Sequence, residues 1–214
     1  MGRPLVVFDF DGTVADSFAE SLAAYNRVAP RLRLRCVAPA EVPELRRLGA
    51  GQLLGALGIP MWKLPRLMIA VRADLMDHFD CVAPVPGIGP ALRELAKTPL
   101  RLAIVTSNSK ANVLAFLARH DLEVFGTVVA GTSVFGKAAR LRRLLKAAGT
   151  DADSSVYVGD TTPDVRAARE AGATAVAVTW GFTAREPLAT ESPDSLLESP
   201  AELPDAILRL LGNR

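Results

Sequence analysis

The sequence has little cysteine and little histidine, with two residues of each among 214. Cys36 and Cys81 lack the C-x-x-C spacing of a zinc or redox site. We therefore expect free thiols in a reducing compartment, which indicates the cytoplasm, with a disulfide between them as the alternative. His78 and His120 stand alone in the sequence, so a zinc site is not expected.

Long apolar runs and a strong net charge are also missing. No run approaches the roughly 20 apolar residues that a membrane span needs. The first strand-like run begins at Leu5, which leaves no room for a secretory signal before it. The formal net charge is +2, too small to indicate binding to nucleic acid or to a membrane surface. A monomer and a homodimer both stay open.

Short apolar runs alternate with helical patterns along most of the chain. Strands are expected at 4–8, 101–106, 127–130, 155–158 and 173–178, and helices at 90–97, 110–119, 137–148, 163–171 and 203–211. Continuous apolar strands between helices predict an α/β fold, with a doubly wound parallel sheet covered on both faces. The segment 185–200 reads as irregular.

One segment interrupts this alternation. No convincing strand occurs between about Ser17 and Val85, and the apolar spacing there is helical. Ser17 followed by Glu20 has the pattern of a capping box, which predicts a helix start. The sequence thus predicts an α/β core, residues 1–16 and 85–214, with an all-helical domain inserted at 17–84.

Polar residues follow several of the predicted strands. In open α/β sheets, ligands bind beyond the carboxyl ends of the strands. The residues at these ends are Asp9, Asp11, Ser107, Asn108, Lys137, Asp160 and Asp164. Like charges as close as those of Asp9 and Asp11 need a cation or a shared proton. Converging carboxylates suit Mg²⁺, which we expect here.

Two of these residues allow a second interpretation. Asp164 follows Thr162 and Pro163, which fit an N-cap and the first helical position, so its acid could simply complement a helix dipole. Lys137 in the first turn of a helix opposes the dipole at a cost of about 0.3–1 kcal/mol. A bound anion would reverse that cost.

The segment Gly131–Lys137 also matches most of the phosphate-binding pattern G-x-x-x-x-G-K-[ST]. Ala138 replaces the final hydroxyl residue, which would supply a metal ligand. This interpretation also leaves the acids unexplained. We therefore favour a site with Mg²⁺, a phosphate-like group and an aspartate nucleophile.

The stretches "VVFDFDGTVADS", "IVTSNS", "FGK" and "VYVGDTTPDVRAAREAG" resemble the four ordered motifs of the haloacid dehalogenase superfamily. The phosphoglycolate phosphatase-like branch with a helical cap is most similar. The resemblance covers nearly the whole chain and implies an Mg²⁺-dependent phosphatase acting on a small phosphorylated metabolite. The insertion at 17–84 lies where that cap belongs.

The resemblance also implies a role for each site residue. Asp9 would form an aspartyl-phosphate, and Asp11 would be the general acid/base. Mg²⁺ would be held by Asp9, the backbone carbonyl of Asp11 and Asp160, with Asp164 binding it or ordering its water. Ser107 and Asn108 would bind the phosphoryl oxygens, with Thr106 as the alternative hydroxyl. Thr13 would support the first motif and contact the substrate. Lys137 would neutralise the charge of the phosphate and of the nucleophile.

The cap would bind the leaving group and so set substrate preference, and Arg46 and Arg47 are its candidate anion-binding residues. Three alternatives stay open. A phosphomutase keeps the same motifs, a haloacid dehalogenase is expected to lack Asp11, and a non-catalytic phosphate-binding protein would not turn over a phosphate ester.

Overall fold

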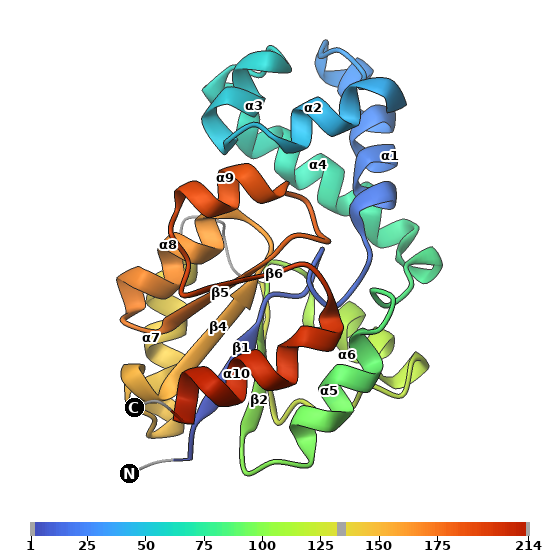
Figure 1. Cartoon of the computed structure of the whole chain (residues 1–214). Coiled ribbons are helices and arrows are strands. Elements are labelled where there is room, and N and C mark those ends of the chain that lie inside the picture. The colour runs from blue at the N-terminus through green and yellow to red at the C-terminus, as the bar shows by residue number, and fades with distance from the viewer. Residues whose placement is uncertain (1–2, 132–135, 213–214) are drawn as a thin grey trace.

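The computed structural model describes residues 3–131 and 136–212. These residues form a six-stranded sheet with the order β3-β2-β1-β4-β5-β6, in which every neighbouring pair is parallel (Figure 1). The strands are β1 (Leu5–Phe8), β2 (Arg101–Val105), β3 (Thr127–Val129), β4 (Ser155–Gly159), β5 (Thr174–Val178) and β6 (Ser195–Leu197). The strand order reverses at β1, which places the switch point of this doubly wound sheet between β1 and β4.

Helices cover both faces of the sheet. The described α-helices are α1 (Phe18–Val28), α2 (Val42–Arg46), α3 (Ala50–Ala56), α4 (Leu64–Asp77), α5 (Ile88–Ala96), α6 (Lys110–Arg119), α7 (Lys137–Ala148), α8 (Thr162–Ala171), α9 (Arg185–Thr190) and α10 (Leu203–Gly212). Val6 and Phe8 of β1 pack in one core with α5, α6 and α10. Leu5 and Val7 point the other way, into a core with α7, α8 and α9. This alternation confirms the predicted α/β fold class.

The predicted strands and core helices all form, with ends within two residues of those expected. The prediction of an irregular segment at 185–200 is wrong, because this segment contains α9 and β6. Strand β6 has three residues and pairs with β5 at the edge of the sheet. Asp194 directs this pairing, since its backbone N–H and its carboxylate both bond to Ala175. So short a strand has too little pattern to be recognised from sequence.

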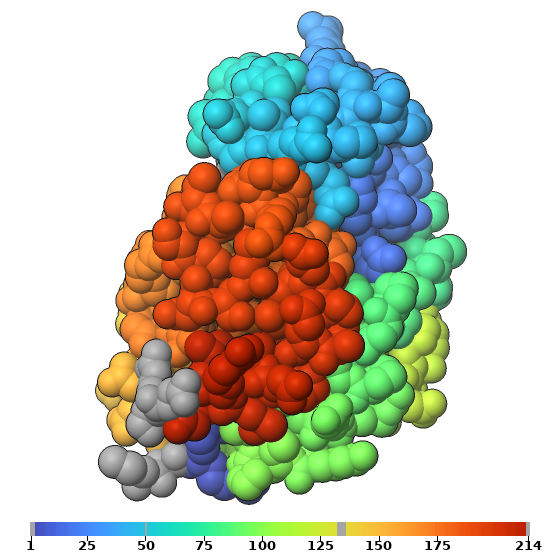
Figure 2. Space-filling model, in the orientation of Figure 1, coloured from blue at the N-terminus to red at the C-terminus, as the bar shows by residue number. Residues whose placement is uncertain are grey.

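The helices between β1 and α5 pack around an apolar cluster of their own. In Figure 1 this insertion lies above the carboxyl ends of the strands, and Figure 2 shows it against the segment that carries α9. The chain leaves and re-enters the core through paired backbone, where Asp16 N–H donates to Ala83 and Val85 N–H donates to Val14. The backbone pairing lies near the predicted boundaries, 16/17 and 84/85, and the division of the chain into two domains there stays a prediction.

Helix α1 begins at Phe18 with Ser17 as its N-cap, but the predicted capping box is wrong. The Ser17 side chain makes no capping hydrogen bond to the helix. Its backbone, at φ −93° and ψ 3°, lies outside the extended conformation that aims an N-cap hydroxyl at the first turn.

Two predictions about chain chemistry can be compared with the structure. Cys36 and Cys81 are exposed free thiols, as expected. Within the described residues, every helix is too short or too polar to cross a membrane.

Candidate active site

Two carboxylates meet at the switch point of the sheet. Asp9 directly follows β1 and Asp160 directly follows β4, and the two strands are adjacent, with Phe8 opposite Val158. The Asp9 N–H continues the ladder to the Val158 carbonyl at 2.8 Å. Asp9, Asp160 and Asp164 are all buried, and one carboxylate oxygen of each lies within 4.8 Å of the others. The convergence expected from the strand ends is therefore present.

Lys137 supplies a positive charge inside this cluster. Its Nζ lies 3.1 Å from Asp9 Oδ2 and forms a second ion pair with Asp164. Burial by itself would lower the pKa of Lys137, but the charges of Asp164 and Asp9 outweigh burial and raise this pKa well above its usual value. The ammonium group is therefore held charged. The central part of the Gly131–Lys137 pattern, residues 132–135, lies outside the described residues.

One lysine does not balance the surrounding acids. Burial raises the pKa of Asp9 well above its usual range, and the neighbouring carboxylates raise it further against the opposing charge of Lys137. Burial, together with the charge of Asp164, raises the pKa of Asp160 to about 7. Hard oxygen donors crowded in this way match the ligand preference of Mg²⁺, whose charge would relieve their repulsion. The residues present therefore fit a divalent cation.

Asp164 is engaged on both oxygens. Oδ2 accepts from the backbone N–H of Thr161 at 3.0 Å and from the Thr161 hydroxyl. Oδ1 accepts from Lys137 and, at 3.4 Å, from the Tyr157 hydroxyl. The expected N-terminal role of Asp164 in its helix is confirmed, but the N-cap is Thr161 and not Thr162, since Thr162 is already the first helical residue. Metal binding by Asp164 stays a prediction.

Asp11 faces the loop after β2. Asn108 Nδ2 lies 3.2 Å from each oxygen of the Asp11 carboxylate. Burial raises the pKa of Asp11, while the hydrogen bond from Asn108 and the charges of Lys137 and Arg72 oppose the rise. The Thr106 hydroxyl accepts from the Asn108 N–H at 2.9 Å, and Ser107 is half-buried. The choice between these two hydroxyls for phosphoryl binding stays open.

Asp160 is oriented by one donor on each oxygen. The Thr13 hydroxyl donates to Oδ1 at 2.8 Å, and the Phe182 N–H donates to Oδ2 at 2.7 Å. Gly181 is needed at this turn, because a Cβ there would clash with the Asp160 carboxylate. The structure thus places Thr13 behind an acid, and substrate contact by Thr13 stays a prediction. No sequence motif pointed to Gly181 or Phe182.

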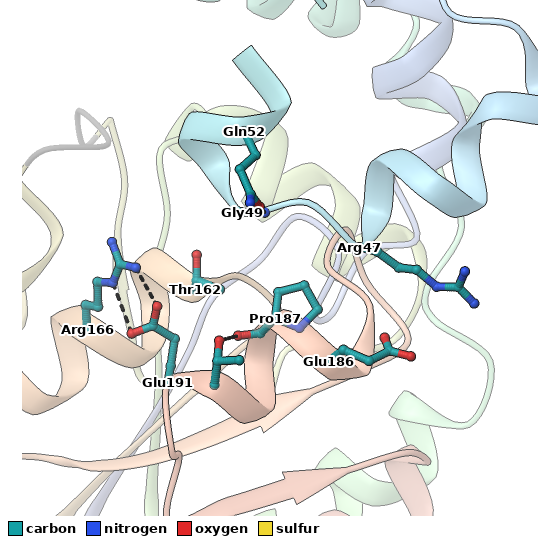
Figure 3. Close-up of a pocket in the computed structure, with 9 residues that line it drawn as sticks. Arg47, Gly49, Gln52, Thr162, Arg166, Glu186, Pro187 and Glu191 are labelled. Atoms are coloured by element: carbon teal, nitrogen blue, oxygen red, sulfur yellow. Dashed lines mark hydrogen bonds and ion pairs between the residues drawn. The ribbon is translucent and has the colours of Figure 1, made fainter. Parts of the chain in front are cut away.

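The two cap arginines lie in different surroundings. Arg46 is half-buried and reaches the backbone carbonyls of the loop after β5. Arg47 is exposed, donates to Glu44 at 2.9 Å and points away from Thr162 and Arg166 of α8 (Figure 3). Substrate binding by either residue stays a prediction.

A pocket of about 390 Å³ opens between the insertion and the helices α8 and α9 (Figure 3). Gly49 and Gln52 line it from the insertion, and Thr162 lines it from the first turn of α8. Arg47 also lines this pocket, whereas Asp9, Asp160 and Asp164 are not among its lining residues.

The charge of another residue of the insertion makes a small contribution to the pKa of Asp11. Arg72 of α4 is exposed, yet its charge lowers the pKa of Asp11 against the effect of burial. Sequence reasoning missed Arg72, since only the folded position of α4 distinguishes it from other helical arginines.

Comparisons with known proteins agree with this geometry. A family model described as haloacid dehalogenase-like hydrolase matches residues 6–178. The chain is 37% identical over 207 residues to the phosphoglycolate phosphatase of Synechococcus elongatus, covering 96% of this chain and 98% of the relative. The phosphoglycolate phosphatase of Vibrio vulnificus is 28% identical over 218 residues, covering 95% of this chain and 96% of the relative.

Solved structures share the fold. A protein described as a predicted phosphatase from Clostridium acetobutylicum matches with a TM-score of 0.80 at 19% identity, covering 98% of this chain and 100% of that one. A haloacid dehalogenase-like family protein from Streptococcus pneumoniae has a TM-score of 0.73 at 20% identity, with coverages of 95% and 98%. The sequence motifs, the parallel sheet and these matches lead to one conclusion: the chain belongs to the haloacid dehalogenase-like hydrolase family.

Proposed function

We propose that this protein is a phosphatase that hydrolyses a small phosphate monoester through a phosphorylated Asp9. The observation that carries the proposal is the buried pairing of Asp9 with Lys137 at 3.1 Å, beside Asp160 and Asp164. A carboxylate held next to a fixed ammonium group can meet a phosphoryl group whose negative charge the ammonium offsets. Phosphoryl transfer requires mainly such positioning and charge stabilisation.

In the first step, an Asp9 oxygen attacks phosphorus and the ester oxygen leaves. Asp11, whose pKa is raised by burial, supplies the proton that this oxygen needs. In the second step, Asp11 takes a proton from the water that attacks the aspartyl-phosphate, and free phosphate and Asp9 are regenerated. Two easier steps thus replace one difficult displacement. Asn108, bonded to both oxygens of Asp11, would keep this acid oriented in both steps.

Mg²⁺ is the cation that this donor set fits, and Asp9, Asp160 and the backbone carbonyl of Asp11 would hold it. When bound, it would neutralise negative charge on the phosphoryl group and on the acids. Asp164 is already engaged by Lys137, Tyr157 and Thr161. We infer that Asp164 mainly holds Lys137 in place and orders water near the cation.

The substrate that we propose is a small acidic ester such as phosphoglycolate. The phosphoglycolate phosphatases among the relatives support this class.

The test is phosphate release and covalent labelling in the Asp9→Asn and Asp11→Asn variants with Mg²⁺. Asp9→Asn should release no phosphate and take up no label, since an amide is a poor nucleophile. Asp11→Asn should lose about 10²–10⁴-fold in turnover, the usual contribution of a general acid or base. With an activated aryl phosphate, whose leaving group needs no proton, Asp11→Asn should still become labelled and should then hydrolyse slowly.

The product identifies the reaction class. Free phosphate supports a phosphatase, whereas an isomeric sugar phosphate without free phosphate would indicate a mutase. Labelled and active Asp9→Asn protein would contradict the assignment of Asp9 as the nucleophile.

A further inference from the structure

Arg46 joins the helical insertion to the core. Its Nε lies 3.3 Å from the Phe182 carbonyl, and its Nη2 contacts the carbonyls of Thr179, at 3.3 Å, and Gly181. The Arg46 carbonyl in turn accepts from the Ala184 N–H at 2.8 Å. These contacts span more than 130 residues of sequence and tie the end of α2 to the loop that follows β5.

The same loop holds a carboxylate of the acid cluster. Asp160 Oδ2 accepts from the Phe182 N–H at 2.7 Å, and Gly181 packs against the carboxylate where a side chain would clash. The peptide group between Gly181 and Phe182 therefore contacts both Arg46 and Asp160. Its carbonyl accepts from Arg46, and its N–H donates to Asp160. A shift of this loop would change the direction in which Asp160 presents its oxygens.

Aromatic contacts strengthen the connection. The rings of Phe18 and Phe182 pack edge to face with centroids 5.3 Å apart. The Arg46 guanidinium lies 5.3 Å from the centroid of the Phe18 ring. A planar guanidinium with five donors suits a set of converging carbonyls beside a ring better than an ammonium group does.

We propose that Arg46 is a positioning residue that couples the seating of the helical insertion on the core to the orientation of Asp160 for Mg²⁺. This inference rests on the proposed function, in which Asp160 helps to hold the cation. In this arrangement the guanidinium is used by the carbonyls of Thr179, Gly181 and Phe182, so its charge acts on the loop and not on the substrate. Loss of Arg46 should therefore reduce turnover equally for every substrate.

The experiment measures Mg²⁺ binding by titration calorimetry, without substrate, for the unmodified protein, Arg46→Met and Arg46→Lys. Arg47→Met is the matched control, because it removes the same charge at the next residue, which is exposed and pairs with the exposed Glu44 of α2. Because Arg46→Met removes charged hydrogen bonds to the loop that orients Asp160, we expect this variant to bind Mg²⁺ about tenfold more weakly, equivalent to about 1.4 kcal/mol.

Arg46→Lys should recover part of the affinity, and Arg47→Met should bind Mg²⁺ like the unmodified protein. At limiting Mg²⁺, Arg46→Met should lose turnover equally on phosphoglycolate and on an uncharged aryl phosphate. Unchanged Mg²⁺ affinity in folded Arg46→Met overturns the inference. A KM increase confined to phosphoglycolate also overturns it, because it would show that Arg46 binds the substrate carboxylate. If the unmodified protein binds Mg²⁺ but hydrolyses no phosphate ester, the proposed function fails, while the Mg²⁺ titrations still decide the role of Arg46.

Discussion

Replacing Asp160 by asparagine should stabilise the metal-free protein while abolishing its response to Mg²⁺. Asp160 is fully buried next to Asp164, and burial together with that charge raises its pKa from 3.8 to about 7. The folded protein therefore disfavours the ionised form. An amide at this position has nearly the same shape but carries no charge.

The size of the effect follows from the pKa. Since one pKa unit corresponds to about 1.36 kcal/mol, ionised Asp160 destabilises the folded state by up to about 4 kcal/mol above pH 7. The amide Oδ1 can accept from the Phe182 N–H, and its NH₂ can donate to the Thr13 hydroxyl if that hydroxyl rotates. Because this exchange is imperfect, we expect a net gain of about 1–3 kcal/mol. Each kcal/mol should raise Tm by about 2–4 °C in a chain of this size.

The assay is thermal unfolding in EDTA between pH 5.5 and 8.5, repeated with Mg²⁺. A raised acid pKa means that the folded state binds the proton more tightly than the unfolded state. The contribution of Asp160 to stability is therefore greatest at low pH and is lost as pH rises from about 4 to about 7. In this assay the metal-free unmodified protein should lose stability between pH 5.5 and about 7, and Mg²⁺ should restore it most at high pH. Asp160→Asn should show a smaller slope and little response to Mg²⁺.

Asp121→Asn is the control, because it removes an acid from an exposed position whose positive φ, 54°, asparagine tolerates. It should leave Tm and the Mg²⁺ response nearly unchanged. If Asp160→Asn is less stable than the unmodified protein in EDTA at pH 8, the carboxylates are not mutually destabilising and the reasoning from crowding is refuted.

Two further predictions concern Lys137 and Asn108. Lys137→Ala leaves Asp9 and Asp164 without their buried counter-charge, so it should destabilise the metal-free protein by about 3–5 kcal/mol in denaturant unfolding. It should also remove phosphatase activity, measured as phosphate release. Unchanged stability would contradict the pairing. Asn108→Ala removes a donor whose hydrogen bond lowers the pKa of Asp11, so Asp11 should stay protonated to higher pH. The alkaline limb of the kcat/KM profile should therefore shift to higher pH. A shift in the opposite direction would show that Asn108 does not favour the ionised acid.

Much of the core could be predicted from sequence, because strand and helix patterns are local. The apolar runs that became β1, β2, β4 and β5 contain the signal of a buried parallel strand, and each is nearly continuous in buried residues. The approach of Asp9 to Asp160 was also predictable. Parallel strands end at one edge of the sheet, so acids that follow two central strands must lie close together.

Other features depend on contacts between distant segments. Strand β6 has three residues and forms by pairing with β5, so its own sequence does not specify it. The Asp164 carboxylate could be assigned to a helix start from local spacing, but its ion pair with Lys137 could not. The order of strands brings these two residues together.

The roles of Arg46 and Arg72 show the same division most clearly. The sequence indicated Arg46 only together with Arg47, as a candidate anion-binding residue, and gave no reason to select Arg72. The docked insertion places Arg46 on the carbonyls of the loop after β5 and brings the charge of Arg72 within reach of Asp11. The sequence alone determined the residues at the strand ends, because apolar periodicity is local and parallel strands end at the same edge of the sheet. Only tertiary packing decided which residues of the insertion lie near them, because that depends on how two separately packed clusters dock.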